Sequence, residues 1–348
     1  MGNWAELLED LLVGIAKRIP VFEDFVAFGG VCRSWRSVAI KQNFKGSQQI
    51  PRLMLAEEEG EEKANEHRIV SLTKGGMVRK LMVPGARRKR CFESLGWLVT
   101  VSEDGEMNLL HPFSQVQIPL PHINTFKHYK INGMSDNFIF IQKAVLSSTP
   151  DTLGNNDYVV MVIYGSLGWL GFWRPGFKSW TTVQIPEVAL YDINYYNGKC
   201  YGVNVGGLIC ACDVNETEAQ LDFFGDYGDD PNFDPDNVDE SRVEAKQFRL
   251  FEVDLNNGGG WKDKKSLGDI ALFLGDNASI SVQASKFPGI KANCIYYTDD
   301  CWEAYGCFKR GGGKDMGIYN LEDGSRMPLY KRDSFSSICP PIWVNPSF

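Results

Sequence analysis

The sequence predicts a mainly β protein that carries a small helical unit at its amino terminus. Two observations support this division. Apolar residues follow a helical spacing through the first four dozen positions, and from Pro51 onward they follow the period of two that is typical of strands. The predicted units are therefore residues 1–48, folded as three short helices, and residues 51–348, folded as β-strands.

Three helices are expected in the amino-terminal unit. The first covers residues 6–19 and ends before Pro20, a residue that disrupts a helix interior. A second is expected at residues 24–28, before two glycines, and a third at residues 31–39. Two neighbouring apolar stripes define the first helix: Leu7, Leu11, Ile15 and Ile19, and beside them Leu8, Leu12 and Ala16.

Short strand-like segments with hairpin signals follow. Asp104-Gly105 and Asn197-Gly198 are typical of tight turns between antiparallel strands. Many short strands without intervening helices favour a closed all-β architecture. At roughly 45–50 residues per blade, the 298 residues of this unit predict a β-propeller of about six or seven blades. The predicted strands cover residues 52–55, 69–72, 97–101, 159–164, 200–205, 208–212, 249–253, 280–282, 295–298 and 317–320.

Composition and charge exclude several classes of partner. The chain has 36 basic and 44 acidic side chains, and its net charge of −8 disfavours binding to nucleic acid. Its longest uncharged stretch, residues 158–173, is too short to span a membrane. Nine cysteines without a C-x-x-C motif indicate reduced thiols. We therefore expect a cytoplasmic or nuclear protein, or both, without nucleic-acid or membrane partners.

No catalytic residue, metal ligand or cofactor site is predicted. The chain lacks a G-x-S-x-G motif, and Lys314 is followed by Asp315 where a phosphate-binding loop needs Ser or Thr. Cys210 and Cys212 have no companion ligands at zinc spacing, so core thiols are expected. A propeller hydrolase acting on sugars is the least favoured alternative, because it needs a deep central pocket with convergent carboxylates.

The helical unit raises the question of what covers its apolar residues. Three short helices bury little surface by themselves, because so small a unit has only a marginal core. The first helix is apolar over a wide face, which must pack either on the β-unit or on another chain. Docking between helices and an apolar groove is a common mode of recognition.

The helical unit resembles an F-box. Residues 7–39, "LLEDLLVGIAKRIPVFEDFVAFGGVCRSWRSVA", follow the order of that motif, with two departures. Leu8 stands where the family has proline, and the turn before Asp24 is one residue longer. The matching positions are Leu7, Leu11, Leu12, Ile15, Val31, Cys32, Arg33, Trp35 and Arg36.

The resemblance extends to both ends of the β-unit. Residues 83–101, "VPGARRKRCFESLGWLVTV", and residues 315–348 look like plant F-box/kelch-like proteins of the KIB type. This resemblance implies a carboxy-terminal β-propeller and a non-catalytic substrate-recognition subunit of a Skp–cullin–F-box ubiquitin ligase. The propeller would bind a target protein that the sequence does not identify. The residues implied to bind the Skp-type adaptor, and through it a cullin, are Leu7, Leu8, Leu11, Leu12, Ile15, Ile19, Val31, Cys32 and Trp35.

A propeller scaffold that no longer joins a ligase is the first alternative, and Leu8 and Gly29-Gly30 are the features that favour it.

The acidic and basic segments of the chain are expected to have no specific binding role. The acidic segments 57–63 and 222–240 are expected to be solvated loops, and Arg87-Arg88-Lys89-Arg90 to be a basic loop rather than an import signal. Blade packing or the target-binding face is expected for Trp169, Trp173, Trp180, Trp261 and Trp302.

Overall fold

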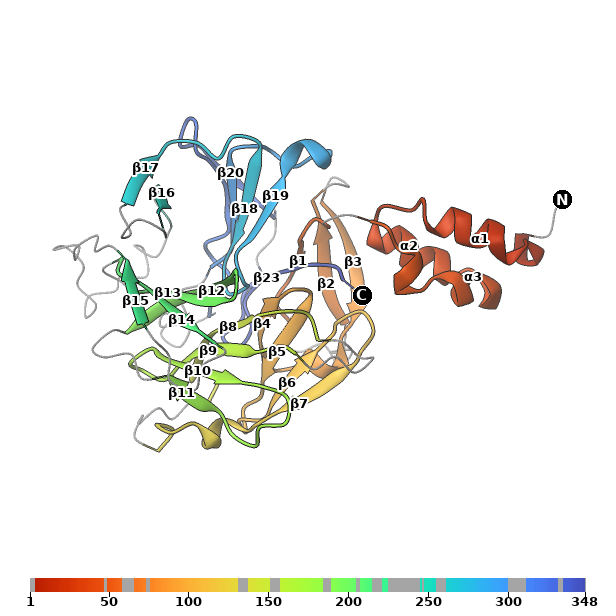
Figure 1. The fold of residues 1–348 in the computed structure, drawn as a ribbon. Coiled ribbons are helices and arrows are strands. Elements are labelled where there is room, and N and C mark those ends of the chain that lie inside the picture. Colours follow the sequence, from red (N-terminus) through yellow and green to blue (C-terminus); the bar gives the residue numbers. More distant parts are fainter. Residues whose placement is uncertain are drawn as a thin grey trace.

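The structure, a computed structural model, is mainly β and has its helices at the amino terminus (Figure 1). Among the described residues, no helix has both the length and the apolar character needed to span a membrane. The residues it describes are 4–46, 49–57, 66–72, 76–130, 137–150, 157–183, 189–204, 207–214, 221–224, 245, 247–254, 261–299, 311–330 and 334–347.

Three α-helices form the amino-terminal unit: α1 (Glu9–Ala16), α2 (Phe22–Gly29) and α3 (Arg33–Val38). The helix α1 starts later than predicted, because Leu8 is its N-cap residue and has an extended ψ of 141°. Single 3₁₀ turns lie at Trp4–Glu6 and Lys41–Asn43 on either side of the helices, and at Pro84–Ala86, Ile123–Thr125 and Ala284–Lys286 in the β-unit.

Five sheets form the blades of a propeller, and each predicted strand coincides with a strand of the structure. The first sheet is β23 (Ile342–Val344), β1 (Arg52–Met54), β2 (Glu66–Ser71) and β3 (Met77–Met82), and the second is β4 (Arg90–Ser94), β5 (Trp97–Val101), β6 (Met107–Leu110) and β7 (Gln117–Leu120). The third is β8 (Ile141–Leu146), β9 (Val160–Tyr164), β10 (Trp169–Trp173) and β11 (Thr181–Val183), and the fourth is β12 (Leu190–Tyr196), β13 (Lys199–Asn204), β14 (Ile209–Asp213) and β15 (Leu221–Phe224). The fifth is β19 (Ile280–Gln283), β18 (Ile270–Leu274), β20 (Cys294–Tyr297), β21 (Gly317–Asn320) and β22 (Arg326–Pro328), and β16 (Leu250–Val253) and β17 (Trp261–Lys264) form a separate hairpin.

The prediction of six or seven blades is wrong, since the propeller has five. The estimate assumed roughly 45–50 residues per blade. The 298 residues of the unit instead supply about 60 for each of the five blades. One reason is the hairpin β16–β17, which pairs with none of the five sheets.

The first blade closes the ring, because its strands come from both ends of the β-unit. Strand β23, near the carboxyl terminus, pairs with β1, so that Leu53 faces Trp343. Trp343 is fully buried, and its ring meets Phe273 of the fifth blade edge-on at 4.9 Å. Its Nε1 donates a hydrogen bond to Leu274 O at 3.1 Å. One side chain thus fastens the last blade to the first.

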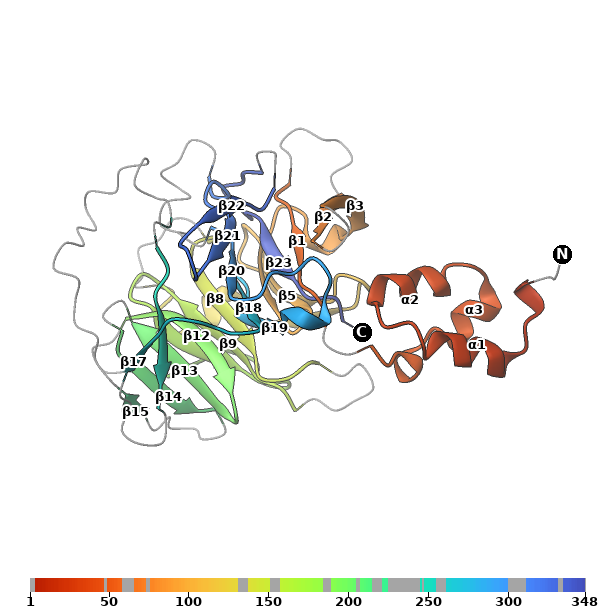
Figure 2. The same ribbon diagram turned by 90° about the horizontal axis from the view of Figure 1, so that it is seen from above.

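The helical unit touches the propeller through α2. The ring of Phe22 packs edge-on against Phe113, in the turn between β6 and β7, at 5.0 Å. Gln49 fixes the connection by accepting a hydrogen bond from Phe22 N and donating one to Pro20 O. Both views show α2 nearest the propeller, with α1 and α3 farther out (Figures 1 and 2).

Several predicted segments have a different role or lie outside the described residues. Arg90 is not part of a loop: it begins β4 and is buried in an ion pair with Asp276. Of the two acidic segments, the structure describes only Glu57, which accepts a hydrogen bond from Arg88 N, and residues 222–224 of β15. Trp302 lies outside the described residues, as does the side chain of Trp261.

A buried carboxyl group links the second blade to the carboxy-terminal tail. Glu93, in β4, is fully buried, and its Oε1 accepts hydrogen bonds from Gly96 N at 2.8 Å and Asn345 N at 3.2 Å. Its Oε2 has no hydrogen-bond partner among the described residues. Burial raises the pKa of Glu93 from 4.5 to about 8, because the charged form loses its solvation.

We predict that the Glu93→Gln variant loses part of the pH dependence of stability. Between pH 4.5 and about 8 the folded protein keeps a proton on Glu93 that the unfolded chain releases. The free energy of unfolding therefore falls by a few kcal/mol as pH rises through this window, and levels off above it. Glutamine keeps the oxygen that accepts both N–H groups and cannot ionise. Urea unfolding at a series of pH values measures the difference.

The control for this prediction is Glu106→Gln, which removes one carboxylate from an exposed turn. It should preserve the wild-type dependence on pH. An unchanged slope between pH 5 and 8 in the Glu93→Gln variant would contradict the assignment of this slope to Glu93.

Candidate protein-interaction surface

The helical unit has a small core of its own. Leu12 and Ala16 of α1 pack against Phe25 and Phe28 of α2 and Val38 of α3, and all five are at most 6% exposed. Phe28 stacks at a tilt on Trp35, with ring centroids 4.6 Å apart. This core positions the three helices, and Phe22 of α2 contacts Phe113 of the propeller.

A second set of apolar side chains of the helical unit faces solvent. Leu8 is 72% exposed, Leu11 54% and Val31 58%. Leu8, Leu11 and the half-buried Ile15 are three and four residues apart, so they share one side of α1. Val31 precedes α3, which contacts α1. We call Leu8, Leu11 and Val31 the exposed helical set.

The nine residues predicted to bind an adaptor divide into three groups. The exposed helical set is open to solvent. Leu7, Ile15, Ile19, Cys32 and Trp35 are half-buried, and all but Cys32 pack on the helical core. Leu12 is the exception to the prediction, because it is 1% exposed and offers no surface to another chain.

The sequence pattern also missed two exposed side chains. Trp4 is 69% exposed, although its carbonyl oxygen accepts a hydrogen bond from Trp35 Nε1 at 3.0 Å. Val26 on α2 is 49% exposed. Neither belongs to an apolar stripe of the first helix, and no other signal in the sequence marks them.

Leu8, which stands where the F-box family has proline, has a backbone conformation that proline could also adopt. Leu8 has a φ of −59°, which is within the range that the proline ring imposes. Its carbonyl oxygen accepts hydrogen bonds from Leu11 N and Leu12 N, so it starts the helix. Leucine at this position therefore keeps the local geometry, and its side chain projects into solvent.

We predict that truncation of two neighbouring leucines affects stability to very different extents. Leu12→Ala removes a buried side chain and should lower the free energy of unfolding of the helical unit by about 2–5 kcal/mol. Leu11→Ala should change it by about 0.5 kcal/mol or less, because that side chain is exposed. Hydrogen exchange of the amides in α1–α3 measures both. Similar loss of protection in the two variants would contradict the division between core and surface.

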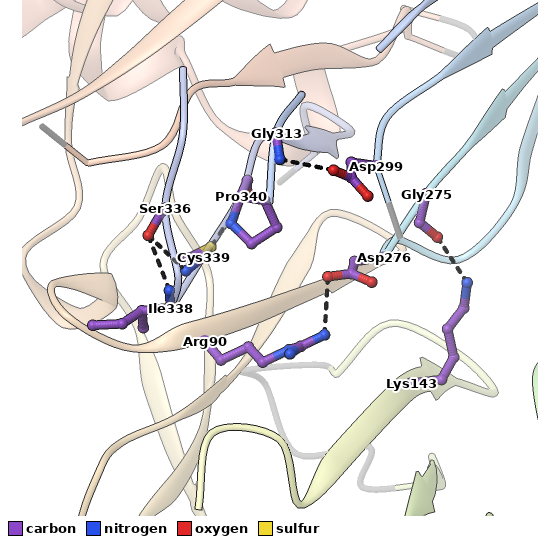
Figure 3. A network of polar contacts seen from close by, with 10 residues as sticks. All are labelled: Arg90, Lys143, Gly275, Asp276, Asp299, Gly313, Ser336, Ile338, Cys339 and Pro340. Atoms are coloured by element: carbon purple, nitrogen blue, oxygen red, sulfur yellow. Dashed lines mark hydrogen bonds and ion pairs between the residues drawn. The ribbon is translucent and has the colours of Figure 1, made fainter. Parts of the chain in front are cut away.

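A propeller hydrolase would need a pair of carboxylates near the propeller axis. Residues 275–278 contact inner strands of the propeller: Asp276 pairs with Arg90 of β4 at 3.2 Å, and Gly275 O accepts a hydrogen bond from Lys143 Nζ of β8 at 2.9 Å (Figure 3). Ala278 N donates to Glu93 O at 2.7 Å. Residues 275–278 are therefore held by contacts with strands of the second and third blades.

The acidic groups at the axis are engaged in structural contacts. Asp276 is 3% exposed, and burial raises its pKa despite the attraction of Arg90. Asp299 accepts a hydrogen bond from Gly313 N at 3.0 Å (Figure 3). Among the described residues, no group of three or more His, Cys, Asp or Glu side chains could hold a metal ion. Both carboxylates are therefore engaged in contacts within the chain.

A cavity of about 680 Å³ lies off the axis, beside the hairpin β16–β17. Its lining mixes both charges with aromatic rings, including Arg249, Asp263, Phe248 and Tyr319. Arg249 and Asp263 approach each other to 3.9 Å. Asp263 in this lining thus has a cation opposite it, whereas glycoside hydrolysis uses a pair of carboxylates that flank the scissile bond.

The structure describes the side chains of three of the tryptophans predicted either to pack blades or to line a binding face. Trp173 and Trp180 are at most 5% exposed and belong to the core between the second and third blades. Trp180 Nε1 donates to Pro121 O at 2.9 Å. Trp169 is only half-buried.

Comparison with known proteins gives consistent matches over the full length of the chain. The model of the KIB1-4 β-propeller family matches residues 69–320. Three Arabidopsis thaliana proteins are similar: F-box protein SKIP23 is 23% identical, over 99% of this chain and 96% of its own. Putative F-box protein At5g55150 is 23% identical over 99% and 98%, and putative F-box protein At4g17565 is 26% identical over 85% and 83%.

Proposed function

Since the chain belongs to the KIB1-4 β-propeller family of plant F-box proteins, we propose that it is the substrate-recognition subunit of a Skp–cullin–F-box ubiquitin ligase. In this proposal the helical unit binds a Skp-type adaptor, and through it a cullin, while the propeller holds a target protein. The observation that carries the proposal is the exposed helical set, which the chain's own propeller leaves uncovered.

The energetics favour a partner on that surface. Burial of a leucine or valine side chain stabilises a complex by about 1.5–3 kcal/mol. Leu8, Leu11 and Val31 are each more than half exposed, so together they supply several kcal/mol when a second chain covers them. The half-buried Trp35 lies beside them as an aromatic anchor, the type of residue that dominates interface energies.

The proposed mechanism requires no bond chemistry from this chain. A receptor that holds a target beside a ubiquitin-charged enzyme raises the effective concentration of the target's lysines. The contact of Phe22 with Phe113 and the bridge through Gln49 join the adaptor-binding helices to the propeller without a long flexible linker. Contact between the two units limits the positions that a bound target can occupy relative to the adaptor.

The test is a charge placed in the exposed helical set. We predict that Leu11→Asp with Val31→Asp weakens binding of a purified Skp-type adaptor by about a hundredfold or more, because two unpaired carboxylates would be desolvated at the interface. Both side chains are exposed in the free chain, so the helices should remain folded. Calorimetric titration of the full chain measures the affinity.

The matched control is Ile40→Asp, an exposed apolar residue after α3 that lies outside the predicted adaptor-binding set. It should leave adaptor affinity within about threefold of the wild type, since surface substitutions away from a contact have small effects. Undiminished binding by the Leu11→Asp, Val31→Asp variant would reject the proposed surface. Absence of adaptor binding by the wild-type chain would favour the scaffold alternative.

A further inference from the structure

The propeller carries an exposed apolar patch at the junction of its third and fourth blades. Leu167, in the turn between β9 and β10, is 59% exposed, and Tyr191, near the start of β12, is 49% exposed. Trp169, at the start of β10, is half-buried. Leu190 N donates to Gly168 O at 3.1 Å, which holds the turn against β12. We call Leu167, Trp169 and Tyr191 the blade-junction patch.

A β-bulge directs Tyr191 away from the sheet. Strand β12 pairs with β13 at Leu190↔Asn204 and then at Asp192↔Val203, so Tyr191 is the extra residue of the bulge. The neighbouring inner strand β8 has the same irregularity at Gln142, whose Nε2 donates to Gly165 O in the β9–β10 turn. Bulges re-aim side chains and are frequent beside functional sites. Two β-bulges at the same end of the inner strands β8 and β12 therefore support a functional site at this place.

Ring contacts hold Trp169, and a turn that requires glycine holds the backbone beside it. The ring of His128 stacks on Trp169 with centroids 4.4 Å apart, and Tyr164 packs against Trp169 at 5.6 Å. Gly168 has a φ of +58°, and a Cβ atom there would lie 2.4 Å from Leu190 O, so only glycine fits the turn. Aromatic residues that are held in place lose little entropy on binding, which is typical of interface anchors.

The charges beside the patch select the kind of partner. Lys127 and Lys130, which flank the stacked His128, are exposed. Asp192, next to Tyr191, is neutralised by Lys143 at 3.0 Å. Among the described residues that adjoin the patch in sequence, the exposed and unopposed charges are thus the two lysines, although the chain as a whole has a net charge of −8. Carboxylates on a partner would be attracted and ammonium groups repelled.

We propose that the blade-junction patch binds an extended segment of the target protein, in which leucine or aromatic side chains are flanked by Asp and Glu. This inference rests on the proposed function, because it assigns the target-binding role of the propeller to particular residues. The apolar side chains pack on Leu167 and Tyr191 beside the edge of Trp169. The flanking carboxylates approach Lys127 and Lys130.

The experiment compares three fluorescent octapeptides by anisotropy with the full-length protein. The first is Gly-Asp-Glu-Leu-Phe-Glu-Asp-Gly, the second replaces its four acidic residues by lysine, and the third replaces Leu-Phe by Ser-Ser. We expect the first peptide to bind at least about tenfold more tightly than either of the others, and to weaken as salt is added. Equal or absent binding of the three peptides would overturn the proposal.

Two double variants locate the binding. Leu167→Ser with Tyr191→Ser should weaken binding of the first peptide by about tenfold or more. Leu95→Ser with Phe177→Ser changes two equally exposed apolar residues in turns at the opposite end of the blades, and should leave the affinity unchanged. Equal affinity in wild type and the first variant would refute the assignment to the patch.

The same proteins separate this inference from the proposed function. The Leu167→Ser, Tyr191→Ser variant should keep wild-type affinity for the Skp-type adaptor, and the Leu11→Asp, Val31→Asp variant should keep peptide binding. Peptide binding at the patch without adaptor binding in the wild type would refute the ligase and leave the patch standing. Adaptor binding without peptide preference would refute the patch alone.

Discussion

The whole account depends on one constraint: three short helices cannot cover all of their own apolar side chains. The small core of the unit is built around Leu12, Phe25 and Val38. Leu8, Leu11 and Val31 remain exposed to solvent. The propeller does not cover them, since α2 is the helix nearest to it (Figure 2), where Phe22 contacts Phe113. An apolar surface that its own chain leaves exposed is typical of a binding site for another protein.

The proposed role of the propeller needs a rigid ring, because a receptor must hold its shape while it binds a target. Pairing of β23 with β1 closes the ring, and the buried Trp343 joins the first and last blades. Asp276 pairs with Arg90 of β4, and Gly275 O accepts a hydrogen bond from Lys143 of β8, so the segment that follows β18 is tied to two other blades (Figure 3). These ties hold the blades in place beneath the turn that carries Leu167.

Much of the fold could be predicted from the sequence, because its signals are local. Helix spacing, hairpin dipeptides and strand-like runs depend on neighbouring residues, and the expected strands coincide with those of the structure. The blade count depends on how much chain lies between strands, which has no local signal. Leu11 and Leu12 sit in adjacent stripes of equal apolarity, so spacing could not separate the exposed residue from the buried one. The bulge at Tyr191 arises from the pairing of β12 with β13, so the sequence of β12 alone could not predict it.

Hydrogen exchange of the full-length chain, with and without a saturating purified Skp-type adaptor, tests the central claim most directly. The account predicts that amides of α1 and of the segment leading into α3 gain protection when the adaptor is added, while those of β1 and β23 are unchanged. Adaptor binding that leaves α1 unprotected, or that protects only the propeller, would contradict it.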